Sequence, residues 1–328
     1  MYELAIGAII VALTFDFING FQDAANSIAT VVGTRVLKPL HAVALAAIAN
    51  FVGPFIFGVA VATTIGKGII DPDFVTIHIV IAALFGAIIW NLITWWLGLP
   101  SSSSHALVGG IIGAGIAGVG THAIIFGGLE KVVTGILVSP IVGLIGAFLL
   151  ASLIVRAFAN KNPANVNSAF GKLQLVSATY FSLTHGANDG QKTMGIIVLI
   201  LLTEGILTSF EVPFWVILIA AVAISLGTFF GGWRIVKTMG ARITQLKPYQ
   251  GFAAETSGAT ILAILAHIGI PASTTHAISG SIMGAGAVRR LSAVRWGIGK
   301  RIVWAWIITI PASTAIAYAI MITLNFFM

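Results

Sequence analysis

The stretch GLPSSSSHA at residues 98–106 recurs 171 positions later as GIPASTTHA at residues 269–277. A second pair, NGFQDAANS at 19–27 and HGANDGQKT at 185–193, recurs in the same order at an offset of 166. Two long matches with nearly equal offsets indicate an internal duplication. The sequence therefore predicts two copies of one unit, residues 1–155 and 173–328, joined by a short polar linker at residues 156–172.

The amino-acid composition predicts that both copies lie in a lipid bilayer. Of the 328 residues, 58% are hydrophobic and only 8% are charged, whereas roughly 25% are charged in a soluble domain. The chain is therefore expected to be an all-α polytopic membrane protein, because helices satisfy their own backbone hydrogen bonds in lipid. The absence of cysteine excludes disulfides and thiolate metal sites.

The positions of the charges predict the orientation of the chain. Ten apolar runs approach or exceed the length needed to cross the membrane. Alternate connections between these runs hold 14 of the 17 basic residues: Arg35, Lys38, Arg156, Lys161, Lys172, Arg234, Lys237, Arg242, Lys247, Arg289, Arg290, Arg295, Lys300 and Arg301. These connections, including the linker, should face the cytoplasm, and both termini should face outward. The net charge of +7 thus records orientation and does not point to nucleic acid.

Each half then contains five predicted crossings, and an odd number inverts the second copy relative to the first. Inverted repeats are common in secondary transporters, which bind substrate near the midplane between the repeats. The proline at 100 or 271 should end one helix, and the serine or threonine after it can cap a half-helix. The amino terminus of such a helix offers free N–H groups to an oxyanion. Capping or packing would explain one block, but the recurrence favours a shared anion cradle.

Five ionisable residues lie inside the apolar runs, where a charge is costly and usually functional: Asp16, Asp23, Asp189, Lys192 and Glu255. A purely structural role is an equal alternative for the first and last of them. The two central aspartates belong to the second recurring pair, whose Gly, Asn and Asp residues predict a broken helix with oxygen ligands for a cation.

Lys192 occupies the position that matches Asn26 of the first copy. Its ammonium could replace a bound Na⁺, neutralise Asp189 or donate to an oxyanion. An anion beside Asp23 and Asp189 would be repelled unless cations or protons are bound there. Binding of the anion and binding of the cation would then favour each other, which is the basis of symport.

At these residues the chain resembles the inorganic phosphate transporter (Pit) family, in its bacterial low-affinity form. The shared elements are Gly-x-x-Asp-x-x-Asn-Ser at 20–27, Gly-Ala-Asn-Asp at 186–189 and the two Pro-Ser blocks. The resemblance implies phosphate import by cation symport with alternating access, no enzymatic activity and no cofactor. It implies phosphate binding at Ser102, Ser103, Ser104, Ser273, Thr274 and Thr275. It also implies that Asp23, Asn26 and Asp189, together with Lys192, couple transport to the cation. The first three residues form the candidate Na⁺ site. The secondary candidates for the site are Asn188, Gln191 and Glu255.

The coupling ion remains open between two alternatives. The Gly-Gln-Lys-Thr sequence at 190–193 resembles the proton-coupled branch, which favours proton symport of phosphate or of a neutral metal–phosphate complex; sodium coupling is the alternative. Two other functions fit the sequence less well. The buried aspartates argue against a passive anion channel, and the duplication of the whole block argues against an intramembrane hydrolase at Ser104 or His105. We expect His105 and His276 to pack or to form hydrogen bonds. We expect an inner-membrane protein, and the glycine-rich helices are compatible with a homodimer.

Overall fold

The computed structural model describes residues 2–327, and helices make up nearly all of their regular structure. The α-helices are α1 (Tyr2–Gly33), α2 (Pro39–Val52), α3 (Ala60–Lys67), α4 (Ile77–Trp96), α5 (Ser103–Gly118), α6 (Phe126–Ala157), α7 (Pro163–Thr203), α8 (Phe214–Phe230), α9 (Trp233–Lys237), α10 (Pro248–His267), α11 (Thr274–Ala287) and α12 (Trp296–Phe327). Short 3₁₀ turns lie at Gly53–Phe55, Pro72–Phe74, Thr121–Ala123 and Leu291–Ala293, and a π-helical turn lies at Thr238–Arg242.

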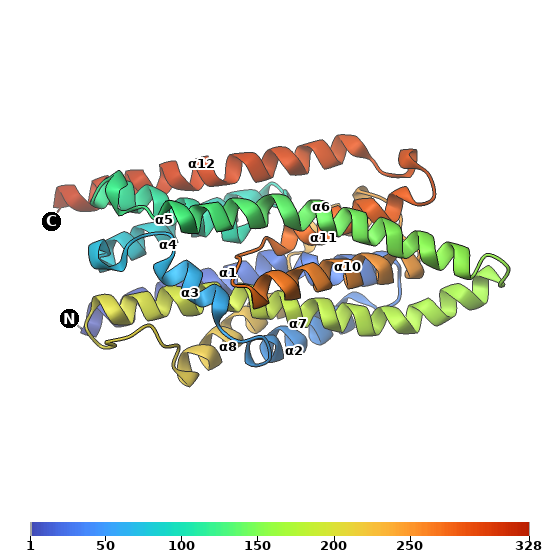
Figure 1. Ribbon diagram of the computed structural model, residues 1–328, viewed down its shortest axis with the longest axis horizontal. Helices are drawn as coiled ribbons and strands as arrows, with labels where there is room; N and C mark the ends of the chain where they lie inside the picture. Colours follow the sequence, from blue (N-terminus) through green and yellow to red (C-terminus); the bar gives the residue numbers. More distant parts are fainter. Residues whose placement is uncertain (1, 328) are drawn as a thin grey trace.

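Four long helices, α1, α6, α7 and α12, run along the length of the molecule (Figure 1). Three of them have 32 residues and α7 has 41, more than the roughly 20 that cross a bilayer. Large apolar side chains on α6 and α12 are exposed, including Leu149 and Ile307, as expected of a surface that contacts lipid. Most of the predicted linker is helical, because α6 ends at Ala157 and α7 begins at Pro163.

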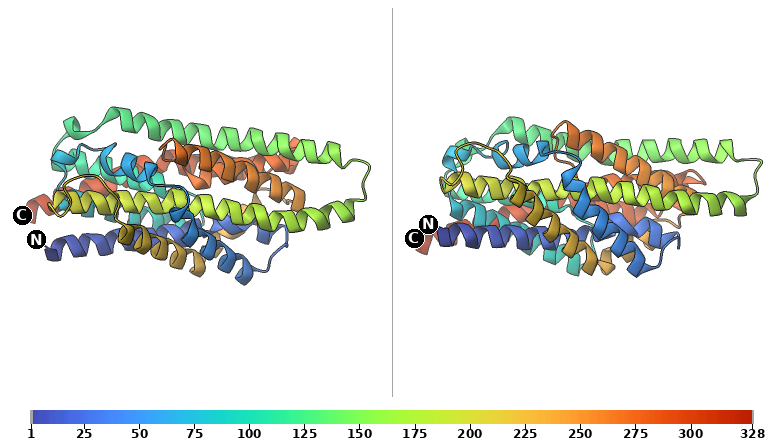
Figure 2. Two further views of the ribbon diagram at one scale, coloured as in Figure 1. Left: turned by 60° about the horizontal axis from the view of Figure 1, so that its bottom comes forward. Right: turned by 90° about the horizontal axis from the view of Figure 1, so that it is seen from below.

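The helices α4, α5, α10 and α11 form two hairpins. Among residues 2–327, four helices are long and apolar enough to cross a membrane, or six if each of the bent pairs α2–α3 and α8–α9 is one span, so the prediction of ten crossings is wrong. The hairpin α4–α5 lies in the half of the bundle near both termini, and α10–α11 lies in the other half (Figure 1; Figure 2 shows two further views). Their tips meet inside the bundle, where the Ser104 hydroxyl donates to the carbonyl of Ala272 at 3.2 Å. The Pro-Ser blocks turn the chain back there. Outside the hairpins, three longer helical paths follow one another in each half of the sequence: α1, α2–α3 and α6, then α7, α8–α9 and α12.

The predicted breaks in α1 and α7 are also absent, since both helices are continuous through residues 19–27 and 185–193. The bends lie elsewhere, 79° between α2 and α3 and 58° between α8 and α9. The glycines of the recurring blocks permit close helix crossings instead. A Cβ on Gly20 would lie 2.2 Å from the carbonyl oxygen of Ile224, and a Cβ on Gly186 would lie 2.3 Å from that of Asn50.

Glycine also lets the second helix of each hairpin pack against a long helix from the other half of the sequence. A Cβ on Gly113 of α5 would lie 2.1 Å from the carbonyl oxygen of Thr314 in α12. In the same way, a Cβ on Gly284 of α11 would lie 2.0 Å from the carbonyl oxygen of Leu144 in α6. These backbone contacts hold both hairpin tips at fixed positions within the bundle.

We expect Gly284→Ala to destabilise the protein, because the new methyl group would have to displace the α6 backbone. Overpacking of this kind costs about 1–3 kcal/mol, and thermal unfolding in detergent would show a lower Tm. Gly7→Ala is the matched control, since nothing lies within 4 Å of its added Cβ. If both variants unfold at the wild-type temperature, the close α11–α6 contact is not required for stability.

Candidate functional site

Each hairpin tip is built by a capped helix, as the sequence predicted. Ser102 is the N-cap of α5 and accepts a hydrogen bond from the backbone N–H of His105 at 3.3 Å. Ser273 is the N-cap of α11 and accepts from the N–H of His276 at 3.2 Å. These caps leave the next hydroxyls, those of Ser103 and Thr274, to face the long helices.

Asp23 of α1 joins the two hairpin tips. The Ser103 hydroxyl shares its proton between Oδ2 of Asp23, at 3.0 Å, and the amide oxygen of Asn19. The Thr275 hydroxyl donates to Oδ1 of the same aspartate at 3.3 Å. Asn26, one turn further along α1, donates to the hydroxyl of Thr275 at 3.0 Å. A single carboxylate therefore holds one hydroxyl from each hairpin.

Asp189 of α7 makes the corresponding contacts from the other side. It accepts from the Thr274 hydroxyl at 3.3 Å and from the ammonium of Lys192. The same ammonium also donates to the hydroxyl of Ser104. Lys192 is completely buried, so the neighbouring carboxylate and hydroxyl take the place of its lost hydration.

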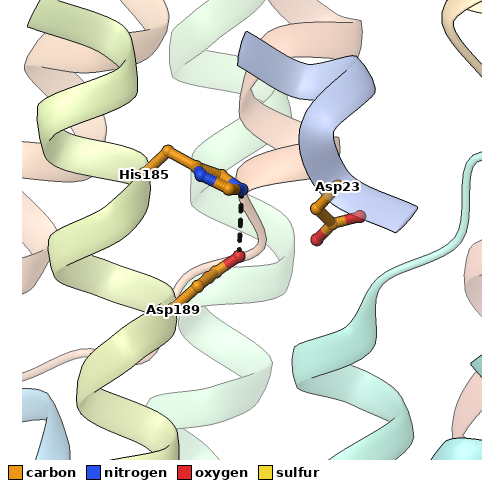
Figure 3. A group of neighbouring side chains, drawn as sticks. All are labelled: Asp23, His185 and Asp189. Atoms are coloured by element: carbon orange, nitrogen blue, oxygen red, sulfur yellow. Dashed lines mark ion pairs between the residues drawn. The ribbon is translucent and has the colours of Figure 1, made fainter. Parts of the chain in front are cut away.

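His185 completes this cluster, and its ring has a defined orientation. Asn50 donates through Nδ2 to the Thr228 hydroxyl at 2.8 Å, so its Oδ1 faces Nδ1 of His185 at 3.1 Å. Nδ1 therefore carries a proton, because an amide oxygen can only accept. The other ring nitrogen, Nε2, lies 3.3 Å from Oδ2 of Asp189 (Figure 3). Two lone pairs would face each other there unless a second proton or a cation lies between them.

The cluster has the geometry of a cation site. One ligand atom from each of Asp23, His185 and Asp189 lies within 4.8 Å of the other two, and Figure 3 shows the three side chains between α1 and α7. Carboxylate oxygens suit Na⁺, a proton or a hard divalent ion, and the imidazole also suits transition metals. Oδ1 of Asn26 is buried and has no hydrogen-bond partner among residues 2–327. Asp23, Asp189 and Asn26 belong to the oxygen-rich site predicted from the sequence, whereas His185 does not.

The secondary candidates lie outside this cluster. Asn188 donates to the carbonyl of Leu262 at 3.2 Å, and Gln191 accepts from the backbone N–H of Val61 at 2.8 Å. These contacts tie α7 to α10 and α3. Asp16 is buried in α1, and neither of its carboxylate oxygens has a hydrogen-bond partner within residues 2–327.

Glu255 belongs to a separate buried group. It accepts hydrogen bonds from Ser177 and, at 2.9 Å, from Gln174, which in turn accepts from Thr34 at 2.9 Å. This group links α10, α7 and the turn after α1 on the side of the hairpin α10–α11. No basic side chain contacts Glu255 within the part of the chain that the structure describes.

The two histidines of the Pro-Ser blocks pack against each other, as expected. Their ring centroids lie 4.4 Å apart, and His276 also stacks on Trp306 at 3.8 Å.

The sequence analysis did not identify His185, Asn19 and Gln22. His185 lies four residues before Asp189, and Asn19 lies four residues before Asp23, so each shares a helix face with its aspartate. Gln22 donates to the Ser101 hydroxyl at 2.9 Å and holds the first hairpin tip.

The family model described as the phosphate transporter family matches residues 19–317. The chain belongs to the phosphate transporter family. A protein of Rhizobium meliloti named "Probable low-affinity inorganic phosphate transporter" is 54% identical over 96% of this chain and 95% of its own length. One of Bacillus subtilis with the same name is 47% identical over 97% of each chain. The relatives are named as transporters, and this multi-pass membrane protein is a transporter and not an enzyme.

A solved structure named "The sodium-dependent phosphate transporter" has the same fold. It is 27% identical to this transporter, with a TM-score of 0.89, and the match covers 99% of this chain and 100% of that chain. The arrangement of helices described above is therefore the fold of a known transporter.

We expect Lys192→Met to destabilise the transporter strongly, because Asp189 would lose the ammonium that faces it in the buried cluster. Removing one partner of a buried ion pair costs about 3–5 kcal/mol, which a lower Tm in detergent would report. The double variant Lys192→Met with Asp189→Asn removes both charges and should recover most of the loss. A double variant no more stable than the single one would contradict this pairing.

Proposed function

We propose that this transporter imports inorganic phosphate by cation symport, with phosphate bound where the two hairpin tips meet. The proposal rests on the hydrogen bonds that the hydroxyl groups of the hairpin tips make in the structure. Ser103, Thr274 and Thr275 donate to Asp23 and Asp189, and a bound phosphate would need the same donors. The carboxylates and phosphate therefore compete for one set of hydrogen bonds.

This competition couples phosphate to a cation. A proton or metal ion at Asp23 weakens its hold on the hydroxyls and removes the negative charge that repels phosphate. The freed hydroxyls of both tips can then turn to the phosphate oxygens, with Ser102, Ser104 and Ser273 beside them. Each ligand improves the binding of the other, as thermodynamic linkage requires.

The coupling ion that we favour is the proton. Lys192 already supplies a fixed positive charge to Asp189 and Ser104, at the position that Asn26 occupies in the first copy, so the second half needs no bound Na⁺. A proton shared by His185 and Asp189 would relieve the facing lone pairs. A neutral metal–phosphate complex would bring its own cation to Asp23. Sodium at Asp23, Asn26 and Asp189 is the alternative, supported by the solved relative, whose name describes it as sodium-dependent.

The contacts between the two halves of the chain support alternating access. We propose that residues 1–155 and 173–328 are inverted repeats, each contributing one hairpin. The matched glycine contacts support this, since Gly113 meets α12 and Gly284 meets α6 at equivalent points. The site residues are buried from both ends, with Asp23 only 3% exposed, which favours a carrier over an open channel. The distribution of basic residues between the two ends of the bundle supports termini that face outward.

Phosphate uptake into proteoliposomes tests the function. We expect an inward proton gradient to drive accumulation of phosphate above its external concentration, and a protonophore to abolish that accumulation. A sodium gradient imposed at constant pH separates the alternative coupling ion. Phosphate that only equilibrates, whatever gradient is imposed, would indicate a passive anion channel.

We expect Lys192→Asn to shift uptake from the proton gradient toward the sodium gradient, because the variant carries in both copies the oxygen ligand found at Asn26. Uptake is measured under each gradient in turn. Lys172→Asn is the matched control, since it removes an exposed lysine from the same helix. Unchanged proton dependence in the Lys192 variant would contradict the role of the ammonium as a fixed cation.

A further inference from the structure

A cationic pocket lies at the end of the bundle opposite the termini, where α11 turns into α12. Its volume is about 530 Å³. The lining includes three guanidinium groups together with the polar side chains of neighbouring residues: Arg289, Arg290, Arg295, Thr244, Gln245 and Ser292. The arginines are exposed, whereas Thr244 is only 4% exposed. No carboxylate is among the lining residues.

These arginines are not neutralised by the protein. Within residues 2–327, the ion pairs are both made by Asp189, and no hydrogen bond from the three guanidinium groups is found. Acidic residues outside the core lie at the other end of the bundle, where the exposed Asp73 and Glu130 and the half-buried Asp71 are near the termini. Three positive charges without an acidic partner therefore line one concave, polar space.

The fold does not need these arginines to form the turn. The backbone N–H of Arg295 donates to the carbonyl of Ile243 at 2.9 Å, and at the other end of the bundle Ile125 donates to Ile69 at 2.9 Å. A 3₁₀ turn precedes the long helix in both places, with Arg290 as its N-cap in one and Gly120 in the other. The same backbone turn thus forms before α6 without any arginine.

We propose that Arg289, Arg290 and Arg295 form an anion site for a phosphoryl group, separate from the transport cluster. Guanidinium groups match phosphate oxygens in a bidentate geometry. The Ser292 hydroxyl and the amide of Gln245 add uncharged donors, and α12 begins at Trp296, so its amino-terminal dipole adds positive potential. The ligand is either the headgroup of an anionic lipid or a soluble phosphate ester on the predicted cytoplasmic side.

The experiment measures binding to purified, delipidated full-length protein in detergent, with phosphatidylglycerol and ATP as separate probes. Phosphatidylcholine is the control lipid. We expect one of the two probes to bind, and the triple variant Arg289→Gln, Arg290→Gln, Arg295→Gln to weaken that binding at least about tenfold. The matched control Arg156→Gln, Lys161→Gln, Lys172→Gln removes three basic residues from the same end and should bind like wild type. Lipid binding alone or ATP binding alone identifies the source.

Equal losses in both triple variants would overturn the proposal, because they would indicate only a general effect of charge. So would failure of the wild type to bind either probe. Hydrogen exchange on the wild-type protein provides a test that needs no variant. The bound probe should slow exchange at the amides of residues 290–296, and unchanged exchange there would equally reject the site.

Discussion

The structure depends on two carboxylates buried between α1 and α7, each of which holds hydroxyl groups from the hairpin tips. Asp23 accepts from Ser103 of one hairpin and Thr275 of the other, while Asp189 accepts from Thr274 and from Lys192. Charges at this depth are costly and usually pair with one another or with polar groups. The contacts of these two carboxylates therefore join the two halves of the chain.

The backbone makes these contacts attainable through close helix packing. Gly20 and Gly186 lie next to the aspartate turns and allow α1 and α7 to cross neighbouring helices with almost no separation. The hairpins are held against α12 and α6 by Gly113 and Gly284. Lipid supplies no hydrophobic driving force between helices, so association depends on close packing. This packing keeps the hairpin tips beside the carboxylates.

The recurring blocks and the resemblance to the phosphate transporter family predicted that Ser103, Thr274, Thr275, Asp23, Asp189 and Lys192 would lie near one another. The sequence also predicted a serine or threonine cap after each proline, which the structure places at Ser102 and Ser273. The sequence predicted the path of the chain less well. A glycine beside Asn and Asp is equally compatible with a helix break or a close crossing, and only the neighbouring backbone decides between them. The 20 residues of α4 have the length of a full crossing, so the hairpin could not be recognised from length.

The central claim is that the carboxylates and phosphate compete for the same hydroxyl groups. Equilibrium binding of phosphate to purified wild type and Asp23→Asn, measured across pH and sodium concentration, tests it most directly. We expect wild type to bind phosphate more tightly as its coupling cation increases, and Asp23→Asn to lose most of that dependence. Phosphate binding that depends on the cation equally in both proteins would contradict the competition.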